Sequence, residues 1–161
     1  MIEFNSKESL FENGFRGFKS VKELRNDTSI IPNEKGVYLV LNFNLNDTDF
    51  LEKGTGGFFK NKDPNVSIEE LHKSFVDNSL VVYIGKANSL RRRIKQYLDF
   101  GEGKKVGHQG GRYIWQIKHN SELVFCWKVI QSKDPREVEK DLISMYKKQF
   151  GEQRPFANLR D

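Results

Sequence analysis

The chain has 161 residues and a formal net charge of +5, because 27 lysines and arginines outnumber 22 aspartates and glutamates. One cysteine, Cys126, excludes a disulfide framework, and together with three scattered histidines it excludes a structural zinc site of the usual kind. No apolar stretch of about 18 residues and no basic, apolar leader is present, so we expect a reducing, cytoplasmic location without a membrane span.

The first half of the chain predicts short helices followed by one buried strand. Residues 1–30 favour one or two short helices, with the expected core anchors Phe11, Phe15 and Phe18. After a turn at residues 32–36, the β-branched and aromatic run "VYLVLNF" predicts a strand. The polar, glycine-containing stretch that follows includes a short helix with the N-cap signature "SIEE" at its start.

The second half predicts two strands, each followed by a helix. "LVVYIG" is the second strand, and the next helix begins at Asn88 or Ser89 and runs to about residue 100. A glycine-rich basic loop covers residues 101–111, and "RYIWQI" after it is ambiguous between helix and strand. "ELVFCWKVI" is the third strand, and Asp134 before a proline marks the start of the last helix.

These elements predict a small α/β domain with a three-stranded sheet flanked by helices. Polar chain without a clear crossover helix separates the first two strands, so a mixed or antiparallel sheet is favoured over a parallel one. The thiol of Cys126 lies in an apolar run and is expected to be buried and inert.

The helix after the second strand carries three consecutive arginines with different surroundings. Helical spacing defines its buried face as Leu90, Ile94, Tyr97 and Leu98. Arg92 lies opposite this face and is expected in solvent, whereas Arg91 and Arg93 flank it on either edge. A partly desolvated guanidinium suits a bidentate phosphate contact, but periodicity does not choose between these two.

On the last helix, Glu139 falls inside the apolar arc that runs from Val138 to Phe150. An unpaired carboxylate there is costly, so a partner is expected. Two interpretations stay open at this point. Glu139 is either a buried residue paired with an arginine, lysine or tyrosine, or a metal ligand or catalytic acid.

Positive charge is concentrated in residues 86–118, which hold nine basic and two acidic side chains. This favours a phosphate-binding surface over a uniformly solvated one. The glycine frames of phosphate loops and dinucleotide folds are absent. Tyr113, Trp115 and Trp127 either belong to the core or are exposed and stack on unpaired bases.

Five separated elements then match one family in order: "GVY", "YIG", "KANSLRRRIKQYL", "VEKDLI" and "PFAN". The chain resembles GIY-YIG nucleases, most closely the N-terminal nuclease domain of the bacterial excision-repair nuclease subunit. The matched core is residues 35–43 and 80–159. The resemblance implies one GIY-YIG-like domain over residues 1–161, with an N-terminal helical extension at 1–34 and an insertion at 45–79 between the first two strands.

The resemblance also implies roles for individual residues. Tyr38 would lie near the attacking water as general base or relay, and Tyr83 would line the same site. Lys86 would favour a phenolate or bind phosphate. The family spacing selects Arg93 over Arg91 as the clamp on the scissile phosphate.

The last helix and the tail complete this implied site. Glu139 would be the single carboxylate that holds one divalent metal, Mg²⁺ or Mn²⁺. Asn158 would buttress the site from the C-terminal tail. Further nucleic-acid contacts are expected from Arg91, Lys95, Lys104, Lys105, His108 and Arg112.

Two departures from the family pattern affect these expectations. The insertion at 45–79 is unusually long, and a lid, a recognition element and a dimer contact are its three candidate roles. Many members carry a histidine four residues after the arginine, where this chain has Tyr97. His108 is an outside candidate for that role, although a solvent-exposed loop histidine is the favoured interpretation.

The resulting functional hypothesis is a metal-dependent endonuclease acting on DNA, in repair, restriction or defence. The alternatives are a non-catalytic nucleic-acid-binding module and a nuclease for RNA or structured junctions. No second DNA-binding domain is apparent, so specificity is expected from the insertion, residues 1–30, a dimer or another protein. The sequence leaves the oligomeric state open.

Overall fold

The computed structural model describes residues 1–45 and 48–160. Its centre is an antiparallel sheet of four strands in the order β1-β4-β2-β3. The strands are β1 (Arg16–Ser20), β2 (Gly36–Leu41), β3 (Val81–Ala87) and β4 (Val124–Val129). The α-helices are α1 (Lys7–Glu12), α2 (Val21–Asn26), α3 (Ile68–Ser74), α4 (Leu90–Gly101) and α5 (Pro135–Gln149). Two 3₁₀ helices are η1 (Arg112–Gln116) and η2 (Asn120–Glu122).

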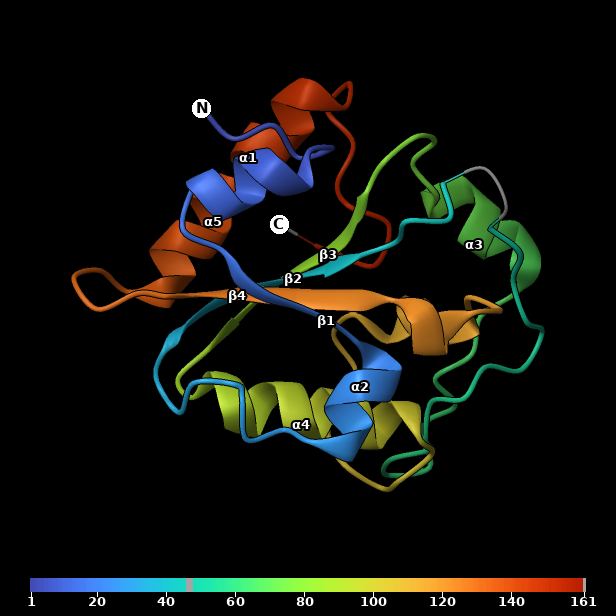
Figure 1. The fold of residues 1–161 in the computed structure, drawn as a ribbon. Coiled ribbons are helices and arrows are strands. Elements are labelled where there is room, and N and C mark those ends of the chain that lie inside the picture. The colour runs from blue at the N-terminus through green and yellow to red at the C-terminus, as the bar shows by residue number, and fades with distance from the viewer. Residues whose placement is uncertain (46–47, 161) are drawn as a thin grey trace.

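The helices cover both faces of the sheet. Figure 1 shows α1 and α5 over one face and α2 and α4 under the other. Side chains of β2 alternate between these layers: Val37, Leu39 and Leu41 pack on the α5 side, and Tyr38 and Val40 pack on the α4 side. In the described part of the chain, no helix combines the length and the apolar character that crossing a bilayer requires.

The three strands and two long helices expected from the sequence are present, and the α/β class is confirmed. Ser89 caps α4 by accepting a hydrogen bond from the Arg92 amide, and Asp134 caps α5 by accepting one from the Arg136 amide. The ambiguous "RYIWQI" segment forms η1.

The expectation of only three strands is wrong, because β1 adds a fourth from the N-terminal extension that was predicted to be helical. The strand is short and irregular, with a register shift between Gly17 and Lys19 and with φ values of 97° at Gly17 and 55° at Phe18. This bulge breaks the alternation on which strand recognition depends. A Cβ at Gly17 would lie 2.6 Å from the Trp127 ring, so only glycine permits this approach.

Among the predicted core anchors of this region, Phe15 is buried and Phe18 is half-buried. Phe11 is 52% exposed, and the guanidinium of Arg16 lies 3.9 Å from its ring centroid, so its assignment to the core is wrong. The three aromatic residues considered for base stacking are buried, which excludes them as exposed stacking platforms: Tyr113, Trp115 and Trp127.

The connection between β2 and β3 runs from residue 42 to residue 80 and contains α3. Ser67 caps α3, as expected, by accepting a hydrogen bond from the Glu70 amide. Phe50 forms an isolated bridge with Ile117, which ties the connection to the segment after η1. The predicted insertion at 45–79 lies within this connection, although its residues 46 and 47 fall outside the described part.

Candidate active site

A groove of about 710 Å³ opens beside β3, which is an edge strand of the sheet. Because an edge strand is accessible to residues from both covering layers, side chains from α4 and α5 both reach this groove. All six side chains expected at the catalytic site line it: Tyr38, Tyr83, Lys86, Arg93, Glu139 and Asn158. They come from β2, β3, α4, α5 and the C-terminal tail.

The pairing of β2 with β3 sets the position of Tyr38. Tyr38 lies directly opposite Gly85 in the antiparallel register. A Cβ at Gly85 would lie 2.4 Å from Tyr38 Cζ and 2.7 Å from its hydroxyl, which is far below van der Waals contact. Because Gly85 has no side chain, the Tyr38 phenol can lie directly against its backbone.

Three tyrosines form a cluster at the base of the groove. The ring centroids of Tyr38 and Tyr83 are 6.0 Å apart, and those of Tyr38 and Tyr97 are 6.3 Å apart. Burial raises the pKa of Tyr38 well above its usual value, and the neighbouring Tyr83 raises it further. Burial, followed by the charge of Glu139, raises the pKa of Tyr83 to about 12. Both hydroxyls are therefore protonated near neutral pH.

The three consecutive arginines have different environments, as helical spacing predicted. Arg92 is exposed and does not line the groove. Arg91 donates from Nε to the Ile31 carbonyl at 2.8 Å and from Nη2 to the Ser29 carbonyl at 3.0 Å, so its guanidinium is tied to the backbone. Arg93 is half-buried and faces the groove, with its Nη1 donating to Gln96 Oε1 at 3.2 Å.

Glu139 is half-buried at the groove wall and has no strong partner. Among the described residues its carboxylate forms no salt bridge within 4.0 Å and no hydrogen bond. Burial raises its pKa, against the opposing influence of the Lys86 and Arg136 cations. The paired-carboxylate interpretation is therefore wrong, and Glu139 presents oxygen atoms available for a ligand.

Asn158 fixes the C-terminal tail against the outer edge of β3. Its Oδ1 accepts from the Ile84 amide and its Nδ2 donates to the Ile84 carbonyl, both at 2.9 Å. The amide of Ala157 donates to the Val82 carbonyl at 2.8 Å. The tail thus pairs with the segment of β3 that carries Tyr83, and Asn158 contacts its backbone.

The expectation that His108 is exposed in the basic loop is wrong, because its side chain is completely buried. Its ring stacks on Tyr97 with centroids 4.0 Å apart and an interplanar angle of 5°. Its Nε2 lies 3.5 Å from the Tyr38 hydroxyl. A buried side chain cannot contact nucleic acid directly. The folding of the loop onto Tyr97 determines this burial, and the local sequence carried no signal for it.

The other basic residues expected to contact nucleic acid are divided between two regions. Arg112 lines the groove beside β3. Arg91, Lys95 and Lys104 line a different groove between α2 and α4, where Lys104 is 3.3 Å from Asp99. Lys105 is exposed in the loop.

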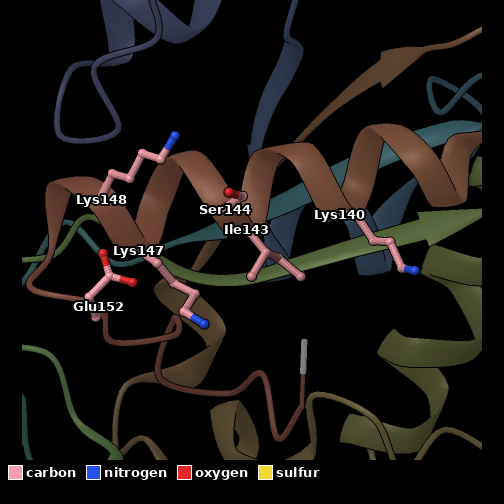
Figure 2. A pocket seen from close by; sticks show the side chains of 6 residues that line it. All are labelled: Lys140, Ile143, Ser144, Lys147, Lys148 and Glu152. Atoms are coloured by element: carbon pink, nitrogen blue, oxygen red, sulfur yellow. The ribbon is translucent and has the colours of Figure 1, made fainter.

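A further basic groove on α5 was not anticipated from the sequence. Figure 2 shows Lys140, Ile143 and Lys147 projecting from one side of the helix, with Ser144, Lys148 and Glu152 completing the lining. Ile143 also lines the groove beside β3, so the two grooves adjoin. A spacing of seven residues, about two helical turns, places Lys140 and Lys147 on the same side of α5, and Lys148 follows directly. The sequence alone did not reveal that these lysines lie next to the groove beside β3.

No group of three or more histidine, cysteine, aspartate or glutamate side chains within residues 1–45 and 48–160 is arranged to hold a metal. Of the carboxylates that the structure describes, Glu139 is the one that lines the groove. A one-carboxylate site suits Mg²⁺ or Mn²⁺, because such ions keep several waters and take further ligands from substrate phosphates.

A family model described as the GIY-YIG catalytic domain matches residues 71–153. This range spans α3 to α5 and includes Tyr83, Arg93 and Glu139. No curated protein and no solved structure matches the chain. The match covers half of the chain, and it begins after β2, so it does not include Tyr38. The chain belongs to the GIY-YIG family and is a phosphodiester-hydrolysing endonuclease whose substrate is a nucleic acid.

Proposed function

We propose that this protein hydrolyses DNA with one divalent metal ion at the groove beside β3. The observation that carries the proposal is the convergence of six side chains from five separate segments on this groove. Together they supply a cation for the phosphate, a carboxylate for a metal and hydroxyls for the attacking water. These are the groups that phosphodiester hydrolysis requires.

Nucleases of this family generally depend on a divalent metal, and Glu139 fits such an ion because its half-buried carboxylate has no other partner among the described residues. When bound, Mg²⁺ or Mn²⁺ would act as a Lewis acid that stabilises negative charge on the phosphate oxygens. Asn158 would hold the adjoining strand in place through its two contacts with Ile84.

Arg93 would bind the scissile phosphate. Its guanidinium is partly desolvated and faces the groove. Burial raises the pKa values of Tyr38, Tyr83 and Tyr97, and the charge of Arg93 opposes part of that rise. A planar, permanently charged donor of this kind matches two phosphate oxygens at once. Lys86 is exposed at the rim and would add a second cation.

Tyr38 would orient the attacking water. Its high pKa means that it meets the water as a neutral phenol, whose oxygen accepts a hydrogen bond from the water. To act as a base, this phenol must pass its own proton to another acceptor as it receives one.

Duplex DNA is the substrate that the surface favours. The aromatic residues considered for stacking on unpaired bases are buried: Tyr113, Trp115 and Trp127. Basic side chains instead extend from Arg112 at the groove beside β3 to Lys140 and Lys148 on α5. Such a surface binds the sugar-phosphate backbone without reading base identity.

Nicking of supercoiled plasmid tests this function. Wild-type protein is incubated with Mg²⁺ or Mn²⁺, or with EDTA, and compared with Arg93→Ala and with its exposed neighbour Arg92→Ala as a charge-matched control. We expect metal-dependent nicking that falls by about 10²-fold or more in Arg93→Ala and stays near wild type in Arg92→Ala. Salt-sensitive binding without cleavage of any DNA or RNA would instead indicate a non-catalytic binding module.

A further inference from the structure

His108 is held rigidly behind the groove although it comes from a loop. Its completely buried ring stacks on Tyr97, and the centroid of the Phe100 ring lies 6.5 Å away with an interplanar angle of 24°. Tyr97 donates its hydroxyl proton to the Gly111 carbonyl, which ties the end of the same loop to α4. The orientation of the imidazole is therefore set by packing on α4.

The imidazole directs one nitrogen at Tyr38. Nε2 lies 3.5 Å from the Tyr38 hydroxyl, whereas Nδ1 is buried and has no hydrogen-bond partner in the described part of the chain. A proton on Nδ1 leaves Nε2 as the acceptor for Tyr38. Catalytic hydrogen bonds are often long before substrate binds, so this separation fits such a role.

We propose that His108 is the final acceptor of the proton that the attacking water loses. This proposal rests on the proposed function, and it names the group to which Tyr38 passes its hydroxyl proton. As the water oxygen forms its bond to phosphorus, a water proton moves to the Tyr38 oxygen and the Tyr38 hydroxyl proton moves to His108 Nε2. The leaving oxygen departs with the electron pair of the broken P–O bond and takes a proton from solvent. After the product leaves, His108 releases its proton through Tyr38 to solvent water, which replaces the proton that the leaving oxygen took.

The charges around His108 make its ability to accept a proton depend on whether substrate is bound. The titratable groups around the imidazole are Tyr38 from β2 and Tyr97 from α4, with Tyr83 from β3 packed against both, and the charged group is Arg93. Burial, and then the Arg93 cation, lowers the pKa of His108 to about 3, so the free enzyme holds it neutral. A phosphate on Arg93 would offset that cation and make His108 more basic.

Two substitutions separate proton acceptance from packing. His108→Gln keeps an oxygen that can accept a hydrogen bond from Tyr38 but cannot take a proton at neutral pH. His108→Phe keeps a ring that can stack on Tyr97 but has no nitrogen. His119→Gln is the matched control, because His119 is exposed and pairs only with Glu122 at 3.7 Å among the described residues. Plasmid nicking is measured from about pH 5 to pH 9, and thermal unfolding is recorded for each variant.

We expect both His108 variants to nick plasmid about 10²-fold or more slowly than wild type near neutral pH. Their rates should rise about tenfold per pH unit, because hydroxide replaces the lost internal acceptor, whereas wild type reaches a plateau. A wild-type rate and pH profile in folded His108→Gln would overturn this proposal alone. Absence of cleavage by wild type would overturn the proposed function together with it. ¹⁵N NMR of the wild-type imidazole provides a test without catalysis: a protonated Nε2 at neutral pH would also overturn the proposal.

Discussion

At the scale of single residues, Glu139 is the least compensated group at the site. Its carboxylate is half-buried, and neither Lys86 nor Arg136 forms a salt bridge with it within 4.0 Å in the described part of the molecule. Leaving an ionised group in such a place costs folding free energy. A carboxylate in such a place is suited to binding a cation, which is the physical basis for our proposal that Glu139 holds the metal.

This cost predicts a dependence of stability on pH. Burial raises the pKa of Glu139 above its usual value of 4.5, so the folded state binds the proton more tightly than the unfolded state. The stability that this proton binding contributes is present at low pH and is lost as pH rises through the raised pKa. Glu139→Gln removes this loss. In EDTA, its melting temperature should exceed that of wild type by an increment that grows from about pH 4 to pH 8.

The matched control for this stability measurement is Glu137→Gln, because Glu137 is exposed on the same helix. Its melting temperature should follow that of wild type at every pH. If Glu139→Gln were less stable than wild type across the range, the carboxylate would have a partner, and its assignment as an available ligand would be wrong.

At the scale of elements, the register between β2 and β3 places the Tyr38 phenol. The space opposite Tyr38 exists because residue 85 is glycine. Gly85→Ala would force the phenol or the strand to move, and overpacking of this kind costs about 1–3 kcal/mol. We expect lower stability in urea unfolding together with reduced nicking.

A double-mutant cycle separates this contact from a general effect on the strand. The smaller side chain in Tyr38→Leu should make room for the new methyl group, so Gly85→Ala should cost less stability in the Tyr38→Leu background than in wild type. Equal costs in both backgrounds would show that the clash does not involve Tyr38.

The sequence predicted the elements whose signals are local. Ser89 and Asp134 are N-caps at the expected helix starts, and the apolar spacing of α4 correctly placed Arg92 in solvent. The strand β1 escaped prediction because the bulge at Gly17 removes alternation. His108 escaped because no local pattern reveals that a loop folds back onto a distant helix. The six predicted site residues lie together only because of the order of the strands in the sheet. No local sequence pattern reveals that order, so the expectation that these residues share one site came from the family resemblance.

At the scale of the whole molecule, the positive charge is not a single surface. The basic side chains of residues 86–118 line two separate grooves, one beside β3 and one between α2 and α4. In the groove between α2 and α4, Arg91 donates hydrogen bonds to backbone carbonyls and Lys104 lies beside Asp99. The groove on α5 adjoins the groove beside β3 and carries three lysines. The proposed path of DNA therefore follows α5. That residues 1–161 form one domain stays a prediction.

Salt dependence of DNA binding discriminates between the two surfaces. Each phosphate contact contributes about 0.9 to the slope of log affinity against log salt concentration for duplex DNA. The double variant Lys140→Ala/Lys148→Ala should reduce this slope by about 2, measured by fluorescence anisotropy in EDTA. Lys95→Ala/Lys104→Ala changes the charge equally and should reduce it less. The opposite order would place the DNA between α2 and α4.

The central claim is that the groove beside β3 hydrolyses phosphodiesters with a metal held by Glu139. The most direct measurement is the rate at which Glu139→Gln nicks supercoiled plasmid in Mg²⁺ or Mn²⁺, beside wild type and Glu137→Gln. We expect a loss of about 10²-fold or more in Glu139→Gln alone, with the protein still folded. Nicking by Glu139→Gln at the wild-type rate would contradict it.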